Sequence, residues 1–276
     1  MMTYREIYSR FEPRYGRGEA RALTRMLLEM GFGMDFTDVV GENLPPLPAE
    51  EESKLELMCR QIEQGRPIQY VLGKTEFCGN IFYVSESCLI PRPETEELCR
   101  WIIEDGGGEN ILDIGTGSGC IAITLSLALP YSRVEAWDIS ADALAMAWLN
   151  ADNLHADIVF EKNDILSYTN NDYNRWDVIV SNPPYICERE KNDMDSNVLD
   201  HEPGIALFVP DENPLLFYRA IARYGRTALN RGGKLYFEIN PLYADDVVGM
   251  MEAECYHVVK VRLDQFGKKR FIRGEI

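Results

Sequence analysis

The feature that most constrains the fold is an alternation of short apolar runs with helical stretches that begins near Asn110. The runs that fit strands are NILDIG, VEAWDIS, DIVFEKND, WDVIVSNPPYI and KLYFEIN. Helical spacing of apolar residues occupies 118–129, 141–154, 213–229 and 243–254. Such alternation is typical of an α/β fold, in which helices cover both faces of a mostly parallel sheet. The last two runs, HVVKVRLD and KKRFIRGEI, have no helix between them, which predicts an antiparallel hairpin at one sheet edge.

The first 72 residues have a different character, because apolar residues recur there at helical spacing and no strand pattern occurs. In GEARALTRMLLEMGFG, four apolar residues share one helix face and Gly31 is the predicted stop. The following GKTEFCGNIFYV holds two β-prone segments around Gly79-Asn80, which predicts a hairpin. The predicted boundaries are 1–72 for a helical domain, 73–92 for a β-hairpin linker and 93–276 for the α/β domain.

The composition excludes several classes of protein. With 28 Lys and Arg against 45 Asp and Glu, the net charge is −17, which argues against a protein that coats nucleic acid. A hydrophobic content of 46% is too high for a disordered chain. No run of about 18 apolar residues and no apolar signal core occur, so we expect no membrane segment. The seven cysteines are scattered without a CxxC pair, which predicts reduced thiols, no metal site and a cytoplasmic location.

A glycine-rich motif, DIGTGSGC, stands at the first strand-to-helix turn of the α/β half. Its glycines let the backbone turn tightly and let a ligand lie against it, and the helix that follows offers unpaired N–H groups to an anion. The dinucleotide pattern GxGxxG does not occur, because Cys120 stands three positions after Gly117. The pattern DxGxGxG is instead that of S-adenosylmethionine sites.

Two acidic residues follow the next two strands. Asp138 ends VEAWD, where a carboxylate can accept two hydrogen bonds from a ribose diol. It could also serve as the N-terminal acid of the next helix, but Ser140 is better placed as the cap. Asp164 follows the third strand, where it could accept from an adenine amino group, and a turn aspartate accounts for it equally well.

The fourth strand is followed by Asn182, Pro183, Pro184 and Tyr185. Prolines often end strands, which explains the two prolines but not the polar residue before them or the aromatic residue after them. Ligands of open α/β sheets bind at the carboxyl ends of strands near the switch point, so we expect this loop beside the glycine loop.

The loop suits methyl transfer to a planar NH2 group, whose lone pair is delocalised. The Asn182 side-chain oxygen and the Pro183 carbonyl can accept the two N–H groups and stabilise the positive charge that grows on the nitrogen. The prolines make the loop rigid, and the Tyr185 ring can pack on a flat substrate. Catalysis would then rest on positioning beside a reactive cofactor, with no general base needed before transfer.

These motifs, with IQYVLGKTEFCG and LIPRPETEEL upstream and HEPGIAL and LDQFGKKRFI downstream, resemble the peptide-chain release factor N5-glutamine methyltransferases of the HemK/PrmC type. The resemblance covers about residues 66–273. It implies a Rossmann-like class I S-adenosylmethionine-dependent methyltransferase sheet with an N-terminal helical domain that recognises the substrate. The implied reaction is methylation of the amide nitrogen N5 of the glutamine in the Gly-Gly-Gln loop of bacterial class I release factors. We expect a monomer that binds neither nucleic acid nor membrane.

The resemblance also implies roles for individual residues. The implied cofactor-binding residues are Gly115, Thr116, Gly117, Ser118, Gly119, Asp138, Asp164, Ile165 and Asn182. The implied catalytic and substrate-binding residues are Asn182, Pro183, Pro184 and Tyr185, with Arg92, Thr95 and Glu96 binding substrate near the mouth of the site. Without the family, a proline-rich start of a helix explains IPRPETE. Two features depart from the family pattern: Ile165 stands where some members have Trp, and VPDENPL at 209–215 replaces a Gly-Gly-x-Asp-Gly-Leu-like loop.

Two other functions stay open at this point. The Asn-Pro-Pro-Tyr loop also serves methyltransferases that act on an adenine or guanine amino group in DNA or RNA, although the acidity and the lack of a basic cluster count against this alternative. A non-catalytic regulator that binds the cofactor is the other alternative, against which the intact Asn182 and glycine loop argue.

Overall fold

The computed structural model describes residues 2–41, 44–168 and 172–276, which group into two compact units. The first unit extends to Lys74 and also includes Asp195–His201, and the second comprises Thr75–Met194 and Glu202–Ile276. The segment Asp195–His201 lies inside the predicted α/β range 93–276, but the structure groups it with the helical unit. A hydrogen bond from Arg14 Nη2 to Asn197 Oδ1 at 3.0 Å joins this segment to the first helix.

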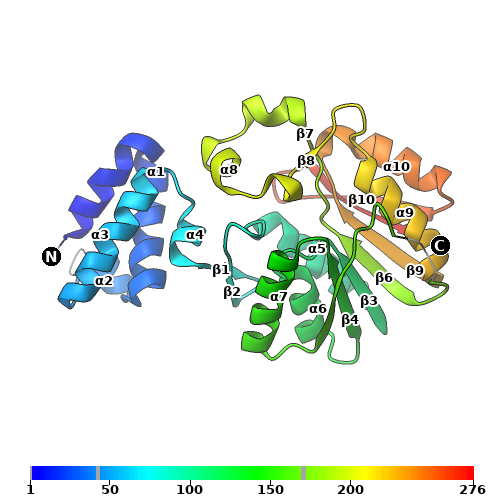
Figure 1. The fold of residues 1–276 in the computed structure, drawn as a ribbon, viewed down its shortest axis with the longest axis horizontal. Helices are drawn as coiled ribbons and strands as arrows, with labels where there is room; N and C mark the ends of the chain where they lie inside the picture. The colour runs from blue at the N-terminus through cyan, green and yellow to red at the C-terminus, as the bar shows by residue number, and fades with distance from the viewer. Residues whose placement is uncertain (1, 42–43, 169–171) are drawn as a thin grey trace. The chain divides into compact units, whose positions relative to one another are not determined.

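The first unit is helical, as its residue spacing predicts (Figure 1). Its helices are α1 (Tyr4–Phe32), α2 (Phe36–Val40), α3 (Ala49–Glu63), α4 (Ile68–Leu72) and α8 (Ser196–His201). A capping box between Thr3 and Glu6 satisfies the first N–H groups of α1. The predicted stop at Gly31 is wrong: α1 continues to Phe32, and the residue that closes it is Gly33, whose φ of 64° lies in the left-handed region.

The core of this unit joins α1 to α3. Ile7, Phe11 and Leu27 of α1 are fully buried, as is Ile62 of α3. Arg10 adds a polar tie, because its guanidinium donates to Glu56 and Glu63 of α3 at 2.7 Å each. Buried apolar contacts between α1 and α3, together with the ion pairs of Arg10, therefore stabilise this unit.

The second unit is built on a seven-stranded sheet of order β10-β11-β9-β6-β3-β4-β5. The strands are β3 (Asn110–Ile114), β4 (Arg133–Asp138), β5 (Ile158–Lys162), β6 (Trp176–Ser181), β9 (Leu229–Glu238), β10 (His257–Leu263) and β11 (Lys269–Glu275). The first five are parallel to one another, whereas β11 pairs antiparallel with both β9 and β10. The predicted parallel sheet with an antiparallel hairpin at its edge is confirmed.

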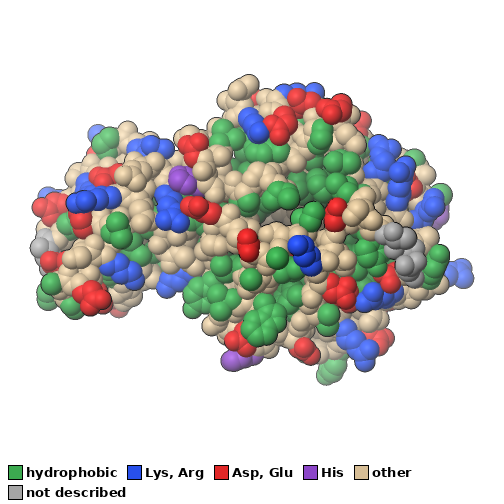
Figure 2. Space-filling model, viewed as in Figure 1, with side chains coloured by type: hydrophobic (Ala, Val, Ile, Leu, Met, Phe, Trp, Pro, Cys, Tyr) green, Lys and Arg blue, Asp and Glu red, His purple; other side chains and the backbone are tan. Residues whose placement is uncertain are grey.

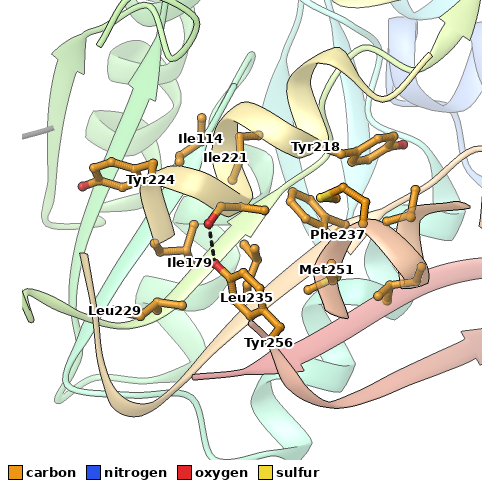
Figure 3. Packing of buried hydrophobic residues seen from close by; sticks show 14 of the residues in the cluster. Ile114, Ile179, Tyr218, Ile221, Tyr224, Leu229, Leu235, Phe237, Met251 and Tyr256 are labelled. Carbon is orange, nitrogen blue, oxygen red and sulfur yellow. Dashed lines mark hydrogen bonds between the residues drawn. The ribbon is translucent and has the colours of Figure 1, made fainter. Parts of the chain in front are cut away.

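Helices cover both faces of the sheet, as predicted (Figure 1). The helices are α5 (Pro93–Glu104), α6 (Cys120–Ala128), α7 (Ala141–Leu154), α9 (Leu216–Ala228) and α10 (Ala244–Ala253). The alternation within β6 shows the two faces: Val178 and Val180 pack with α5 and α6, whereas Ile179 packs with α9. Figure 3 shows the second of these cores, in which the Tyr256 hydroxyl donates to the Ala222 carbonyl at 2.9 Å. The central strands β3 and β6 are buried on both faces, which explains why their sequences are mostly apolar.

Short elements lie around the sheet. The predicted hairpin is present as β1 (Lys74–Phe77) and β2 (Asn80–Tyr83). Segments without a predicted structure form β7 (Ile186–Cys187), β8 (Phe208–Val209) and the 3-10 turns Glu188–Asp193, Gly204–Ala206 and Pro241–Tyr243. All but Glu188–Asp193 have two or three residues, which are too few to show a period in the sequence. Within the described part of the chain, no helix is long and apolar enough to cross a membrane.

Candidate functional site

A cavity of about 300 Å³ lies at the carboxyl ends of β3, β4 and β6 in the second unit. The chain passes from β3 to β4 on one side and later returns to β6 on the other side, so the strand order reverses here. Open α/β sheets bind their ligands at such a switch point. In Figure 2, hydrophobic side chains gather around a hollow in the face of this unit.

The glycine loop forms one wall of the cavity. Gly115 and Gly117 have φ values of 77° and 56°, in the left-handed region where a residue with a Cβ is strained. The N–H groups of Gly115 and Thr116 donate to the Trp137 carbonyl at 2.8 and 3.0 Å, which fixes the turn against β4. Gly119 does not line the cavity, because it lies against α7, where an added Cβ would come within 3.1 Å of the Ala147 side chain.

Asp138 lies at the end of β4 with its carboxylate lining the cavity. Its two oxygens accept from the N–H groups of Gly117 and Ser140 at 2.8 and 2.9 Å. Burial raises the pKa of Asp138, and these backbone donors oppose the rise. A carboxylate has about four acceptor positions, more than these backbone donors use, so Asp138 can still accept from a hydroxyl of a bound ligand. Ser140, and not Asp138, caps α7, since its hydroxyl accepts from Ala143 N.

A buried hydroxyl and a buried carboxylate lie at the glycine loop. The Ser118 hydroxyl is 2% exposed, lines the cavity and has no hydrogen-bond partner among the described residues. Asp113 is buried beneath the loop, where its Oδ2 accepts from the Thr116 hydroxyl at 2.7 Å. Burial raises the pKa of Asp113 to about 7. Buried polar groups of this kind fit a polar ligand above the loop, such as the amino and carboxylate groups of S-adenosylmethionine.

Asp164 and Ile165 line the cavity at the end of β5. The Asp164 carboxylate accepts from Leu166 N at 2.9 Å and from the Ser167 hydroxyl at 3.0 Å, the pattern of a turn aspartate. Ile165 is half-buried against the core and offers the cavity an apolar surface. The structure therefore supports the turn interpretation of Asp164 and still keeps both residues at the cavity.

The Asn-Pro-Pro loop forms another wall of the cavity. Asn182, Pro183 and Pro184 line the cavity, and the Ser181 hydroxyl donates to the Ile114 carbonyl at 2.6 Å. This bond ties the end of β6 to the end of β3, which brings the two predicted loops together as expected. Tyr185 does not line the cavity: its ring is half-buried and its hydroxyl donates to Glu238 Oε1 at 3.2 Å.

Of the IPRPETE residues, Arg92 and Thr95 line the cavity and Glu96 does not. The Arg92 guanidinium donates to Glu202 Oε1 at 2.5 Å, and the Glu202 side chain is only 1% exposed. Thr95 is buried, with its hydroxyl 2.7 Å from Glu238 Oε2. Glu96 accepts from the Cys78 N–H at 3.0 Å and so ties α5 to the β1–β2 hairpin.

Several cavity residues were not among the predicted site residues. They are Ser87, Cys88, Leu89, Pro91, Cys120, Ile121, Ile139, Ser140, Ala143, Asn163, Leu166, Pro203, Ile205, Ala206, Phe217 and Ile221, with Ile114 and Ser181 at the strand ends. The motif HEPGIAL points to three of these residues, because it contains Pro203, Ile205 and Ala206. Glu238 also escaped prediction, although an acid that ends a buried strand such as KLYFE is unusual enough to indicate a role.

Comparisons with known proteins agree with this geometry. The family model for the PrmC N-terminal domain matches residues 4–73, and that for the methyltransferase small domain matches residues 95–201. The release factor glutamine methyltransferase of Bacteroides thetaiotaomicron is 46% identical over 260 residues, which are 94% of this chain and 93% of that protein. The release factor glutamine methyltransferase of Streptococcus pneumoniae is 35% identical over 98% of each chain.

Solved structures with the same fold are methyltransferases. A methyltransferase from Pyrococcus furiosus aligns with a TM-score of 0.53 at 16% identity, over 83% of this chain and 98% of that one. A 16S rRNA N2 methyltransferase of Thermus thermophilus, in complex with AdoMet and guanosine, aligns with a TM-score of 0.52 at 15% identity. The alignment covers 73% of this chain and 49% of that one. These likenesses show the fold alone, and they confirm the predicted Rossmann-like class I methyltransferase sheet.

Proposed function

Because this chain belongs to the release factor glutamine methyltransferase family, we propose that it methylates the amide nitrogen N5 of the glutamine in the Gly-Gly-Gln loop of bacterial class I release factors. The observation that carries the proposal is that the glycine loop and the Asn-Pro-Pro loop, which follow the adjacent strands β3 and β6, both line one cavity. One wall suits a methyl donor and the other suits a planar amide.

S-adenosylmethionine is the methyl donor, and it supplies a methyl group activated by the sulfonium. Gly115, Thr116, Gly117 and Ser118 would hold its methionine part against the start of α6. Asp138 would accept from the ribose hydroxyls through the acceptor capacity that its backbone donors leave free. Asp164 and Ile165 would lie along the adenine, Ile165 through an apolar contact.

Asn182 and Pro183 would hold the substrate amide. The Asn182 side-chain oxygen and the Pro183 carbonyl are the acceptors for its two N–H groups, so the nitrogen is aimed at the methyl group. The same two acceptors would stabilise the positive charge that methylation places on the amide nitrogen. Pro184 keeps the loop rigid.

The helical unit would bind the release factor protein, whereas the cavity would bind only its glutamine side chain. Its match to the PrmC N-terminal domain and its separate core support a role apart from the methyl-transfer cavity. The partner is then a protein in the cytoplasm that the enzyme meets as a monomer, and neither a nucleic acid nor a membrane takes part.

The test is a transfer assay with radiolabelled S-adenosylmethionine. Purified release factor, its Gln-to-Ala loop variant, duplex DNA and ribosomal RNA are offered in parallel. The expected result is label on the unchanged release factor alone. Label on nucleic acid would instead assign the enzyme to the amino groups of bases, and cofactor binding without label on any acceptor would favour the non-catalytic regulator.

A further inference from the structure

The orientation of the Asn182 amide decides whether the proposed substrate can bind. An asparagine side chain has a donor end and an acceptor end of nearly the same size. Only the acceptor, Oδ1, can receive an N–H of a substrate amide. If the amide were turned over, its NH2 would face the substrate NH2, and two donors repel each other. Some group must therefore hold the amide in one orientation.

A buried hydroxyl contacts the donor end of this amide. Asn182 Nδ2 donates to Thr95 Oγ1 at 3.3 Å, and Thr95 Oγ1 in turn donates to Glu238 Oε2 at 2.7 Å. The sheet register explains the meeting: β6 and β9 are parallel with Ser181 beside Phe237, so the next residues of the two strands, Asn182 and Glu238, are also neighbours. Thr95 comes to them from the first turn of α5.

The direction of these hydrogen bonds follows from the carboxylate. An ionised carboxylate only accepts, so the single proton of the Thr95 hydroxyl must be donated to Glu238. The Thr95 oxygen is then left as an acceptor, and only the NH2 end of Asn182 can satisfy it. Oδ1 of Asn182 is thereby turned away from Thr95. A chain of two hydrogen bonds thus fixes the amide.

Glu238 holds the other end of the same loop as well. Its Oε1 accepts from the Tyr185 hydroxyl at 3.2 Å, so one carboxylate fixes the first and the last residue of Asn-Pro-Pro-Tyr. Glu238 is 1% exposed, and its own carbonyl accepts from the Tyr218 hydroxyl at 3.2 Å. Burial of a carboxylate opposes folding, so a loop that only needed to be held would be better served by a neutral group. A carboxylate differs from a neutral group because it cannot donate, which is what sets the direction.

We propose that Glu238 and Thr95 are positioning residues, which hold Asn182 with its Oδ1 toward the substrate amide. This inference rests on the proposed function. It changes the role of Thr95, which the family resemblance implied to be substrate-binding: the hydroxyl gives its only proton to Glu238 and accepts from Asn182. Neither residue touches the reacting atoms, and both act through Asn182.

The test compares variants that keep or remove the hydroxyl. Thr95→Val has the same shape without a donor or an acceptor, and Thr95→Ser keeps both. Thr124→Val is the matched control, because Thr124 is also buried in the second unit but lies outside the cavity and outside this chain of hydrogen bonds. For each variant, kcat and KM for release factor are measured, with the Kd for S-adenosylmethionine by calorimetry and the Tm.

The expected result is a separation of turnover from binding. Thr95→Val should lower kcat by roughly 10- to 100-fold, since a small misplacement of a reacting group has an effect of this size. Its Kd for S-adenosylmethionine should stay within about twofold, because the hydrogen bonds it loses lie on the Asn-Pro-Pro side. Thr95→Ser should recover most of kcat, and Thr124→Val should retain it.

Two results would overturn the inference. One is a Thr95→Val enzyme with unchanged kcat, and the other is a loss of kcat that Thr95→Ser does not recover or that a proportional loss of cofactor binding explains. Failure of the proposed function is a different result, because then the unchanged protein itself puts no label on the release factor. The two failures are therefore told apart by the unchanged protein in the same assay.

Discussion

The two walls of the cavity are built by different means. The glycine loop is fixed mainly through its own backbone: its N–H groups bind Trp137 and Asp138, and the side chain of Thr116 reaches only three residues back to Asp113. The Asn-Pro-Pro-Tyr loop is fixed through side chains. Its partners, Thr95 and Glu238, are 87 and 53 residues away from Asn182 and Tyr185 in the chain.

The difference indicates a division of labour. The glycine loop would recognise the cofactor through the shape of its backbone, so it tolerates few changes of backbone conformation. The Asn182 amide is held by side chains that are distant in the chain, so that its oxygen keeps one direction. Methyl transfer requires this, because the oxygen must accept from the substrate amide. Substitutions on the two walls should therefore affect different measured quantities, binding on one side and turnover on the other.

The largest effect is expected from Asn182→Ala. Loss of the amide oxygen removes one of the two acceptors for the substrate amide, so kcat should fall by roughly 100- to 1,000-fold. The Kd for S-adenosylmethionine, measured by calorimetry, should be partly retained, because the glycine loop is untouched. An Asn182→Ala enzyme that transfers methyl groups normally but has lost cofactor binding would reverse the division between the walls.

On the other wall, Asp138→Asn should weaken cofactor binding. The variant keeps the size of the side chain but loses the charge and one of the two acceptor oxygens. The N–H groups of Gly117 and Ser140 then compete with the ribose hydroxyls for the remaining oxygen. Hydrogen bonds to charged groups are worth about 1.5–3 kcal/mol, which corresponds to a Kd roughly 10- to 100-fold higher. At saturating cofactor, kcat should change much less. A kcat that stays low at saturation would contradict the assignment of Asp138 to binding.

The acid side of the pH profile should depend on Glu238. Burial raises its pKa above the ordinary value of 4.5, while Thr95, Tyr185 and Arg270 oppose the rise and Glu94 adds to it. The protonated carboxyl can donate to Thr95, which frees the Thr95 hydroxyl to turn the Asn182 amide over. The kcat should therefore fall, by up to roughly tenfold, as the pH drops through this raised pKa.

The control for this pH effect is Glu238→Gln, which has no group to titrate at this position. Its kcat should be lower than that of the unchanged enzyme at pH 8 and should not decline further on the acid side. The measurement is kcat from pH 5 to pH 8 at saturating substrates. The same acid decline in both enzymes would assign the titration to another group.

The smallest effect is expected from Asp113→Asn, and it is an effect on stability. Burial raises the pKa of Asp113 to about 7 from its ordinary 3.8, so the folded protein binds a proton that the unfolded chain has released between about pH 4 and 7. The free energy of unfolding must then fall as the pH rises through this window, by at most about 1.4 kcal/mol per pH unit. Urea unfolding at pH 5 and pH 8 should show a smaller decline in the variant. An equal decline in both proteins would mean that Asp113 does not titrate in this range.

Much of the fold could be predicted because its causes are local. Alternating apolar runs and helical spacing predicted the parallel sheet, the covering helices and the hairpin at the edge. Local patterns were less reliable at boundaries: Gly31 was predicted as a helix stop although Gly33 has the left-handed conformation. Very short elements such as β7 and β8 carry no period and were missed.

The sequence by itself determined the architecture and the two loops, because their features depend on neighbours along the chain. These features are the glycines that take positive φ, and the asparagine and two prolines that directly follow a strand. Only the tertiary structure decided how those loops are used. Glu96 is turned to the hairpin, Arg92 is paired with Glu202, and Thr95 meets Glu238. The physical reason is that a side chain takes its role from the groups it meets, and these meet only when the register of β6 and β9 and the packing of α5 bring them together.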